Sequence, residues 1–275
     1  MLHPDFFNIA ECVQASGFSW GMTTNATLID ETAAWKLKQA GMSSVSVSLD
    51  GMERSHDMLR GKDGAWRRAI NGLLSLKKAG LNPQVTTVLH SGNFHDLKPL
   101  YSLLCDMGIE SWRPINVEPI GRICESPDLL LDPEQFNSLL AFIKEKRFDP
   151  DCNMEVTFGC SHYLGIGNER MVRDHYFLCG AGILIASVRS NGDICACLDI
   201  ENRKELAQGN IRTDNFMDIW HNGFRIFRRD RTSDCSKCMN CPDRFICNGD
   251  STHTWNFEKK EPLICYRDYE IKTAN

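Results

Sequence analysis

The chain has 275 residues and a formal net charge of −5, with 42% hydrophobic and 24% charged residues. These values are typical of a soluble globular protein of one or two domains, and the acidic balance argues against a dedicated nucleic-acid binder. No apolar run approaches the roughly 20 residues that a membrane span requires, and the sequence does not open with a charged and then apolar export segment.

The first half of the chain alternates between helical and strand-like periodicity. Apolar residues at helical spacing predict helices over residues 3–16, 31–40, 65–79, 94–107 and 133–145. Short apolar or β-branched runs predict strands over residues 18–24, 45–49, 85–89 and 111–117. Such an alternation indicates parallel βαβ units, and therefore an α/β fold. Active sites of these folds lie after the strands, here at Asn25, Asp50, His90 and Glu118.

The second half has a different organisation. Residues 149–178 are rich in loops, residues 180–198 predict a hairpin turned at 190–193, and residues 216–227 predict one amphipathic helix. We therefore expect a first domain over residues 1–150, a connecting segment over 151–178, and a cysteine-rich domain over 179–275.

Eight of the 13 cysteines fall in the final 97 residues. Disulfides suit short secreted chains, whereas this chain is long and its cysteine count is odd, so metal or iron–sulfur ligation and a cytoplasmic location are favoured. Four of these residues, which we call the C-terminal cysteines, are Cys238, Cys241, Cys247 and Cys265. Their spacing fits one four-thiolate site, and spacing alone does not separate an iron–sulfur cluster from structural zinc.

A second set, the hairpin cysteines, consists of Cys179, Cys195 and Cys197. Cys235 belongs to neither set and could serve as a further ligand that completes the hairpin set. The competing interpretation is that Cys195 and Cys197 are inert small hydrophobic residues on one strand.

Two segments after predicted strands offer polar groups for a ligand. Asn25 can bind a ligand or close an Asx turn, and Arg60 can pair with a ligand carboxylate or remain solvated. Spacing alone favours the solvated interpretation of Arg60 and leaves both interpretations of Asn25 open.

Four segments of the first half resemble the barrel of radical S-adenosylmethionine (radical SAM) enzymes: TTNATLI, VSVSLDG, HDMLRG and GAWRRAINGLLSLKKAGL, at residues 23–29, 45–51, 56–61 and 64–81. The second half resembles the SPASM extension of that superfamily. The positions that match the SPASM pattern are Cys179, Gly192, Cys197, Cys238, Cys241, Cys247 and Cys265. The resemblance implies a partial (βα) TIM-like barrel that lacks its first unit, followed by a small SPASM-type iron–sulfur domain.

Two departures from the family pattern matter. Ser251 stands where SPASM domains have a cysteine. The resemblance therefore implies a complete second auxiliary [4Fe–4S] cluster on the C-terminal cysteines and a first cluster with Cys179 and Cys197, for which Cys195 or Cys235 is a candidate substitute ligand. The C-x3-C-x2-C loop and GGEP-like segment of these enzymes are not found in the 275 residues. We expect a truncated or degenerate chain that does not cleave S-adenosylmethionine by itself.

The resemblance also implies a chemistry. In complete relatives, cleavage of S-adenosylmethionine yields a 5′-deoxyadenosyl radical that abstracts a substrate hydrogen, and auxiliary clusters accept an electron or anchor the substrate. By similarity, Asn25, Ser48 and Arg60 line the cofactor pocket and Asp199 acts as a catalytic base. A peptide or protein substrate and a reducing partner such as a flavodoxin or ferredoxin are expected, and a nucleic acid or membrane is not.

Two alternatives to a peptide-modifying enzyme stay open. One is a non-catalytic iron–sulfur protein for electron transfer or scaffolding. The other is a zinc-stabilised binding module.

Overall fold

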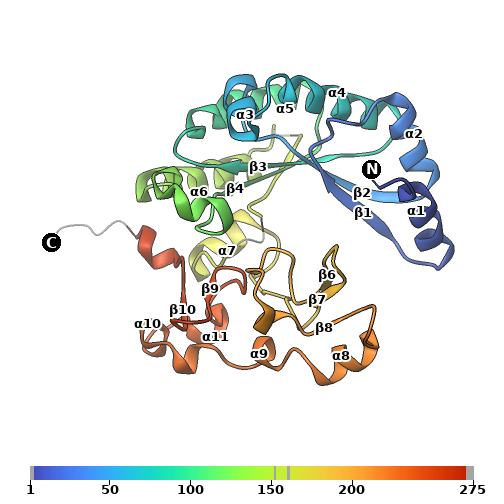
Figure 1. The fold of residues 1–275 in the computed structure, drawn as a ribbon. Helices are drawn as coiled ribbons and strands as arrows, with labels where there is room; N and C mark the ends of the chain where they lie inside the picture. The colour runs from blue at the N-terminus through green and yellow to red at the C-terminus, as the bar shows by residue number, and fades with distance from the viewer. Residues whose placement is uncertain (1–2, 152, 160–161, 271–275) are drawn as a thin grey trace. The chain divides into compact units, whose positions relative to one another are not determined.

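The computed structural model describes residues 3–151, 153–159 and 162–270, and the chain forms two compact units (Figure 1). The first unit comprises residues 1–117 and 138–159, and the second comprises residues 118–137 and 160–275. The second unit therefore contains the segment that follows the fourth strand. No helix in the described ranges is long and apolar enough to span a membrane.

The first unit is built on a parallel five-stranded sheet with the strand order β1-β2-β3-β4-β5. Its strands are β1 (Trp20–Thr24), β2 (Met42–Ser48), β3 (Gln84–Leu89), β4 (Ser111–Asn116) and β5 (Glu155–Val156). Every neighbouring pair is parallel. An open sheet whose order follows the sequence is expected from successive βα units, and the predicted α/β class is confirmed.

Six helices belong wholly or mostly to this unit: α1 (Phe6–Ala15), α2 (Glu31–Gln39), α3 (Glu53–Arg60), α4 (Ala65–Lys78), α5 (Leu97–Asp106) and α6 (Pro133–Arg147). In Figure 1, α3, α4 and α5 lie along one face of the sheet. Fully buried apolar side chains from helices and strands meet there, among them Leu73, Leu76, Val85, Leu104 and Trp112. Burial of this face is the main source of the unit's stability.

Local chemistry fixes where two of these elements lie. The side chain of Asp30 accepts a hydrogen bond from the Ala33 N–H at 2.7 Å and so caps α2. A Cβ on Gly72 would lie 2.4 Å from the Ala26 carbonyl oxygen, so only glycine lets α4 approach the loop after β1. That loop contains Asn25.

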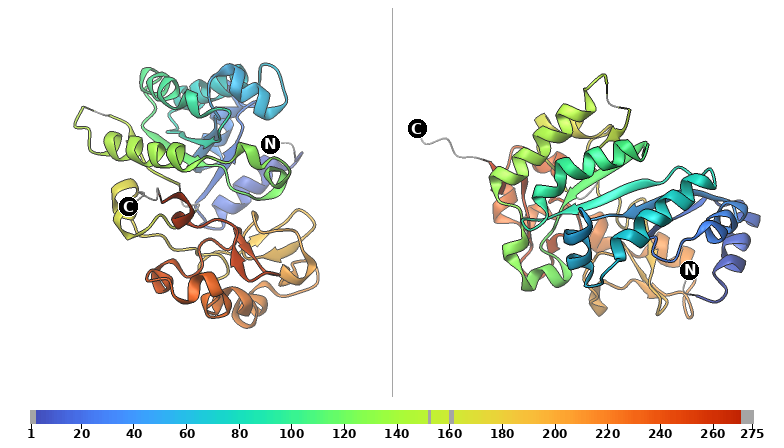
Figure 2. Two further views of the ribbon diagram at one scale, coloured as in Figure 1. Left: turned by 90° about the vertical axis from the view of Figure 1, so that its left-hand side faces the viewer. Right: turned by 90° about the horizontal axis from the view of Figure 1, so that it is seen from above.

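The second unit has short elements, shown from two further directions in Figure 2. Its strands are β6 (Ser187–Val188), β7 (Asp193–Cys195), β8 (Gly209–Asn210), β9 (Trp255–Asn256) and β10 (Glu261–Pro262). Its helices are α7 (Ile166–Val172), α8 (Phe216–Asn222), α9 (Arg225–Arg228), α10 (Ser236–Met239) and α11 (Arg244–Cys247). Strands β6, β7 and β8 form an antiparallel sheet.

The hairpin predicted over residues 180–198 is confirmed, since β6 and β7 pair in antiparallel fashion around the 190–193 turn. The single helix predicted over residues 216–227 is wrong. Phe224 adopts a left-handed backbone conformation, with φ at 60°, and separates α8 from α9. Its ring is fully buried in a core that includes Ile194, Ile200 and Phe227. Tertiary packing therefore overrides the helical periodicity.

Candidate functional site

The residues predicted to hold a cofactor lie at the carboxyl edge of the first unit's sheet. Asn25 follows β1, Ser48 ends β2, and Arg60 ends α3. The side-chain oxygen of Asn25 accepts hydrogen bonds from the Thr27 N–H at 3.2 Å and the Thr27 hydroxyl at 3.0 Å. Asn25 thus forms the Asx turn that the sequence left as one alternative, and its side chain stays exposed.

Asp50 links several elements at this edge of the sheet. Its carboxylate forms an ion pair with Arg60 and accepts the Val88 N–H at 2.9 Å, although its side chain is only 2% exposed. The Asp50 N–H donates to Nδ1 of His56 at 3.0 Å, and the Asp50 carbonyl accepts from the Asn93 side chain at 3.1 Å. Asp50 therefore ties the end of β2 to β3 and α3, and Arg60 is not freely solvated.

Two buried imidazoles near Asp50 keep hydrogen-bonding capacity. Nε2 of His56 and Nε2 of His90 have no hydrogen-bond partner among the described residues. Burial lowers the pKa of both side chains, so each favours the neutral form. Unsatisfied buried polar atoms near Asp50, whose carboxylate pairs with Arg60, fit an edge that receives a polar cofactor.

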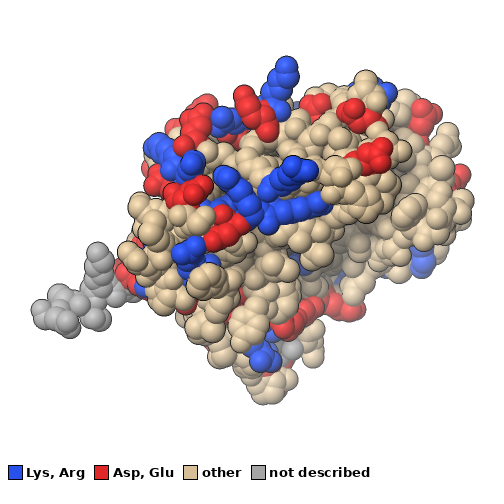
Figure 3. Space-filling view, turned by 90° about the horizontal axis from the view of Figure 1, so that it is seen from below, with Lys and Arg blue, Asp and Glu red and all other residues tan. Residues whose placement is uncertain are grey.

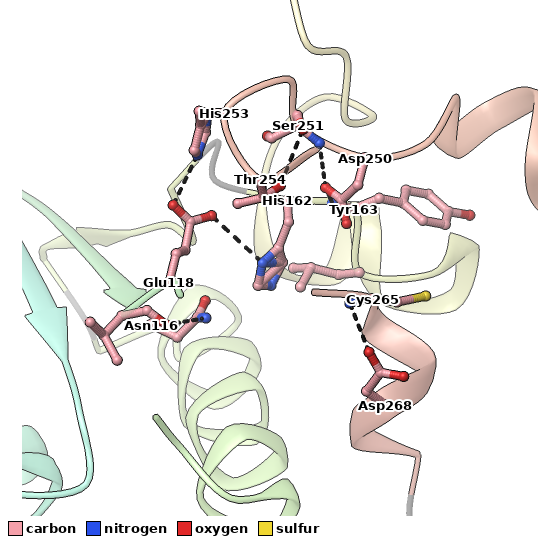
Figure 4. Close-up of polar contacts among 12 residues, drawn as sticks. Asn116, Glu118, His162, Tyr163, Asp250, Ser251, His253, Thr254, Cys265 and Asp268 are labelled. Atoms are coloured by element: carbon pink, nitrogen blue, oxygen red, sulfur yellow. Dashed lines mark hydrogen bonds and ion pairs between the residues drawn. The ribbon is translucent and has the colours of Figure 1, made fainter. Parts of the chain in front are cut away.

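All four C-terminal cysteines line one cavity of about 40 Å³ in the second unit. Cys238 lies in α10, Cys247 ends α11, and Cys241 lies between these two short helices. The Cys265 N–H donates to the Asp268 carboxylate at 3.1 Å, which fixes the last thiol beside the cavity (Figure 4). The residues predicted to form one four-thiolate site are brought together.

The electrostatics of this cavity favour protonated thiols in the metal-free protein. Burial, followed by the neighbouring Cys235 thiol, raises the pKa of Cys238 to about 12. Burial also raises the pKa of Cys247 and of Cys265. Cluster or zinc binding would therefore release protons.

No three His, Cys, Asp or Glu side chains of the described ranges converge closely enough to hold one metal ion. A [4Fe–4S] cluster distributes its protein ligands over four irons, so its ligands need not meet at a single point. Four thiols around one cavity fit such a group.

The hairpin cysteines are not equivalent to one another. Sγ of Cys179 lies 3.3 Å from the Thr252 nitrogen and 3.2 Å from its hydroxyl oxygen. Cys197 lies beyond β7, with its Sγ 3.8 Å from a carboxylate oxygen of Asp199. Cys195 is buried, and its thiol contacts the Ser187 carbonyl at 3.6 Å.

The two candidate substitutes for the missing cysteine therefore have different surroundings. Cys195 packs within the β6–β7 hairpin, and Cys235 lies beside Cys238. Ser251, which replaces the family's cysteine, is buried.

A carboxylate and two histidines form a buried polar network in the second unit (Figure 4). Nε2 of His253 lies 2.9 Å from Oε2 of Glu118, and Nδ1 of His162 lies 4.0 Å from Oε1 of the same carboxylate. Burial lowers the pKa of His162 to about 3. Burial would also lower that of His253, but hydrogen bonds with Cys197 and Glu118 outweigh it and raise the pKa to about 10. His253 is therefore the charged member.

This network adjoins a larger cavity of about 560 Å³, which we call the Trp255 pocket. Its lining includes Asp199, Arg203, Thr252, His253, Trp255 and Phe257. The volume falls within the range of pockets that take small molecules or short peptide segments. Asp199 lies on this pocket, where it could act on a bound molecule. The sequence pointed to Glu118 only as a residue that follows a strand. It gave no indication of a role for His253.

Comparisons with protein families assign both parts of the chain. Residues 1–104 match the radical SAM superfamily, and residues 179–242 match SPASM, an iron–sulfur cluster-binding domain. These families bind [4Fe–4S] clusters and S-adenosylmethionine. The SPASM match includes Cys179, Cys197, Cys238 and Cys241, and it favours an iron–sulfur site over structural zinc.

Curated relatives align over most of the chain. AdoMet-dependent heme synthases from Nitratidesulfovibrio vulgaris and Methanosarcina barkeri are 25% and 28% identical, each over 97% of this chain and 77% and 80% of their own lengths. The mycofactocin maturase MftC of Mycolicibacterium smegmatis is 28% identical over 89% of this chain, which spans 62% of the maturase.

Solved structures show the same fold. Streptococcus suis SuiB bound to S-adenosylmethionine matches with a TM-score of 0.70 and 18% identity over 90% of this chain, which spans 59% of SuiB. The structure of anSMEcpe with AdoMet and the Kp18Cys peptide matches with a TM-score of 0.70 and 18% identity, over 97% of this chain and 77% of that one. The chain thus carries a radical SAM superfamily segment over residues 1–104 and a SPASM iron–sulfur cluster-binding domain over residues 179–242.

Proposed function

We propose that this protein is a radical SAM oxidoreductase that modifies a peptide or protein side chain, with auxiliary [4Fe–4S] clusters in its SPASM domain. The observation that carries the proposal is the Trp255 pocket, which adjoins Cys197 and His253 within the second unit. S-adenosylmethionine, when bound and reduced, supplies the hydrogen-abstracting chemistry of this superfamily. The chain's own residues bind and orient the reactants.

The lining of the Trp255 pocket supports a peptide ligand. Trp255, Phe257 and Leu263 offer apolar surface, while Asn202 and Asn256 offer amide groups that can pair with a peptide backbone. Asp199 is exposed on this pocket and would accept a proton from the substrate as it is oxidised.

The sheet edge of the first unit would hold S-adenosylmethionine. Asn25, Ser48 and Arg60 are the proposed contacts, and Arg60 meets the cofactor while paired with Asp50. The 275 residues contain no C-x3-C-x2-C segment, so we expect them to bind auxiliary clusters and to leave S-adenosylmethionine uncleaved when alone.

A reducing partner such as a flavodoxin or ferredoxin would supply electrons. Lysine and arginine side chains gather near the centre of the face shown in Figure 3. Exposed arginines occur on and after α9, at Arg225, Arg228 and Arg229. A basic surface favours encounter with acidic electron carriers, so we expect the reduction rate to fall as ionic strength rises.

A second substrate class, an iron tetrapyrrole, is favoured by the heme synthases that align with 97% of the chain. The Trp255 pocket could stack a flat ring on Trp255 or Phe257. Arg203 is less available to a propionate, because it lies 3.0 Å from Glu258 in an ion pair.

One binding experiment separates the two classes. The anaerobically reconstituted chain is titrated with Fe-coproporphyrin III, followed by its visible absorption, and is separately incubated with a random heptapeptide mixture, from which retained peptides are identified by mass spectrometry. Asn256→Trp fills the pocket, and Asn222→Trp on exposed α8 is the control. Peptide retention that only Asn256→Trp abolishes supports the proposal.

Saturable porphyrin binding with no retained peptide would replace the peptide by a tetrapyrrole. If neither probe binds but iron and sulfide are incorporated, the protein is an electron-transfer or scaffold protein instead. Zinc without sulfide would overturn the iron–sulfur assignment.

A further inference from the structure

Three basic side chains, which we call the cavity cations, line the cavity that the C-terminal cysteines share. They are Lys237 in α10, Arg244 in α11 and Arg267 in the 3-10 turn Tyr266–Tyr269. Lys237 directly precedes Cys238, and Arg267 follows the last cysteine by two residues. The short elements that position the thiols therefore also place positive charge at the wall of the candidate cluster site.

Each cavity cation is paired with a carboxylate. The pairs are Lys237–Asp268 at 2.9 Å, Arg244–Asp230 at 2.8 Å and Arg267–Glu270 at 3.8 Å. None of these three carboxylates is among the described residues that line the cavity. The basic member of each pair therefore lies at the cavity wall, and its carboxylate lies behind it.

Asp268 connects one of these pairs with a cysteine. Its carboxylate accepts the Cys265 N–H at 3.1 Å and also binds Nζ of Lys237 (Figure 4). Its backbone N–H donates to the Cys265 side chain. Lys237 is thus held beside the cavity by a residue that is hydrogen-bonded with one of the four thiol-bearing residues.

Asp250 is the one carboxylate among the described residues that line the cavity. It is buried, and its Oδ1 accepts the N–H of Tyr163 at 3.1 Å and that of Ser251 at 2.6 Å. Backbone donors therefore already bind this carboxylate. Three cations and one carboxylate leave the described wall of the cavity with an excess of positive charge.

We infer that Lys237, Arg244 and Arg267 raise the reduction potential of a [4Fe–4S] cluster on the C-terminal cysteines, which favours its acceptance of an electron. A cluster with four thiolate ligands carries one more negative charge when it is reduced, so positive charge at the wall stabilises the reduced form more than the oxidised form. The inference rests on the proposed iron–sulfur function of the SPASM domain. The cavity cations act through their charge and are not ligands.

Potentiometric titration of a single cluster in the full chain measures this effect. Cys179→Ser and Cys197→Ser remove the other cysteine group, and the protein is reconstituted anaerobically and reduced stepwise with dithionite while electron paramagnetic resonance follows the reduced cluster. Lys237→Gln should lower the ratio of reduced to oxidised cluster at a given potential about three- to tenfold, where tenfold is about 59 mV for one electron. Lys237→Arg keeps the charge and should change the ratio less than about twofold.

Asp268→Asn should shift the ratio in the opposite direction. It removes the negative charge behind Lys237, while its amide oxygen can still accept the Cys265 N–H. Lys260→Gln is the matched control, because Lys260 is 53% exposed against 44% for Lys237, pairs with Asp234 and does not line the cavity. It should leave the ratio unchanged. Iron content and circular dichroism compare the variants.

Equal potentials in Lys237→Gln and Lys260→Gln would overturn the inference. So would shifts of the same sign in Lys237→Gln and Asp268→Asn, because a general loosening of the site has no reason to reverse with charge. If Lys237→Gln holds no iron, Asp268→Asn decides alone, and a potential no higher than that of the parent chain refutes the inference. A failure of the proposed function differs from these results, since the chain would then take up no iron and sulfide or retain no peptide.

Discussion

Asp50 provides the sharpest test of how the cofactor edge is held together. Asp50→Ala would leave the Val88 N–H without its acceptor and Arg60 without its partner. An unsatisfied N–H costs about 1–3 kcal/mol, and the ion pair adds up to about 1 kcal/mol because the Arg60 side chain is 35% exposed. We expect a loss of about 2–3 kcal/mol, which corresponds to a roughly 30- to 150-fold faster exchange of the Val88 amide.

Hydrogen-exchange mass spectrometry of a peptide covering residues 84–93 measures this change. Asp50→Asn retains an oxygen acceptor and should cost about 1 kcal/mol. Glu53→Ala is the matched control, since it removes an ion pair of 2.7 Å with Arg67 in which both side chains are well exposed. Equal exchange in Asp50→Ala and Glu53→Ala would refute the argument that Asp50 fastens β3.

Three further outcomes are expected. Gly72→Ala should weaken S-adenosylmethionine binding at least about fivefold by calorimetry, because its Cβ would meet the Asn25 loop at 2.4 Å; Gly167→Ala, with open space around its Cβ, should not. Arg231→Met should cost about 2–4 kcal/mol in urea unfolding, because Arg231 is 5% exposed and donates to a backbone carbonyl at 2.7 Å, whereas Arg229→Met should cost under about 0.5 kcal/mol. Zn²⁺ binding to the C-terminal cysteines of the metal-free protein should release at least about three protons per site, from Cys238, Cys247 and Cys265, in weakly buffered solution at pH 7, because burial raises the pKa of these three thiols; release of none would contradict those shifts.

Most strands and helices of the first unit could be predicted from the sequence, because neighbouring residues decide their type and bounds. The β-branched run at residues 45–49 and the capped helix after Asp30 are each specified by neighbouring residues. Helix α3 was missed because residues 53–60 lack an apolar stripe of helical spacing, and α7 lies in a stretch that reads as loop. Their positions depend on the packed structure around them.

The candidate site residues likewise fall into those that local sequence predicts and those that depend on the folded structure. The spacing of the C-terminal cysteines predicts that they share one site, and all four line one cavity. The contact of His253 with Glu118 joins residues 135 positions apart, and no periodicity or motif marks it. Arg60 could be identified as a polar residue after a strand, but its pairing with Asp50 depends on how α3 is oriented.

The left-handed Phe224 has a consequence for how the second unit acquires its shape. That backbone conformation costs a non-glycine residue roughly 1–2 kcal/mol, and here it is offset by complete burial of the aromatic ring. In an isolated peptide of residues 215–228 the ring would have no core to enter. The break between α8 and α9 therefore forms only when the domain is assembled. Before that, the segment should sample a continuous helix, until the Phe224 ring packs into the core against the β6–β7 hairpin.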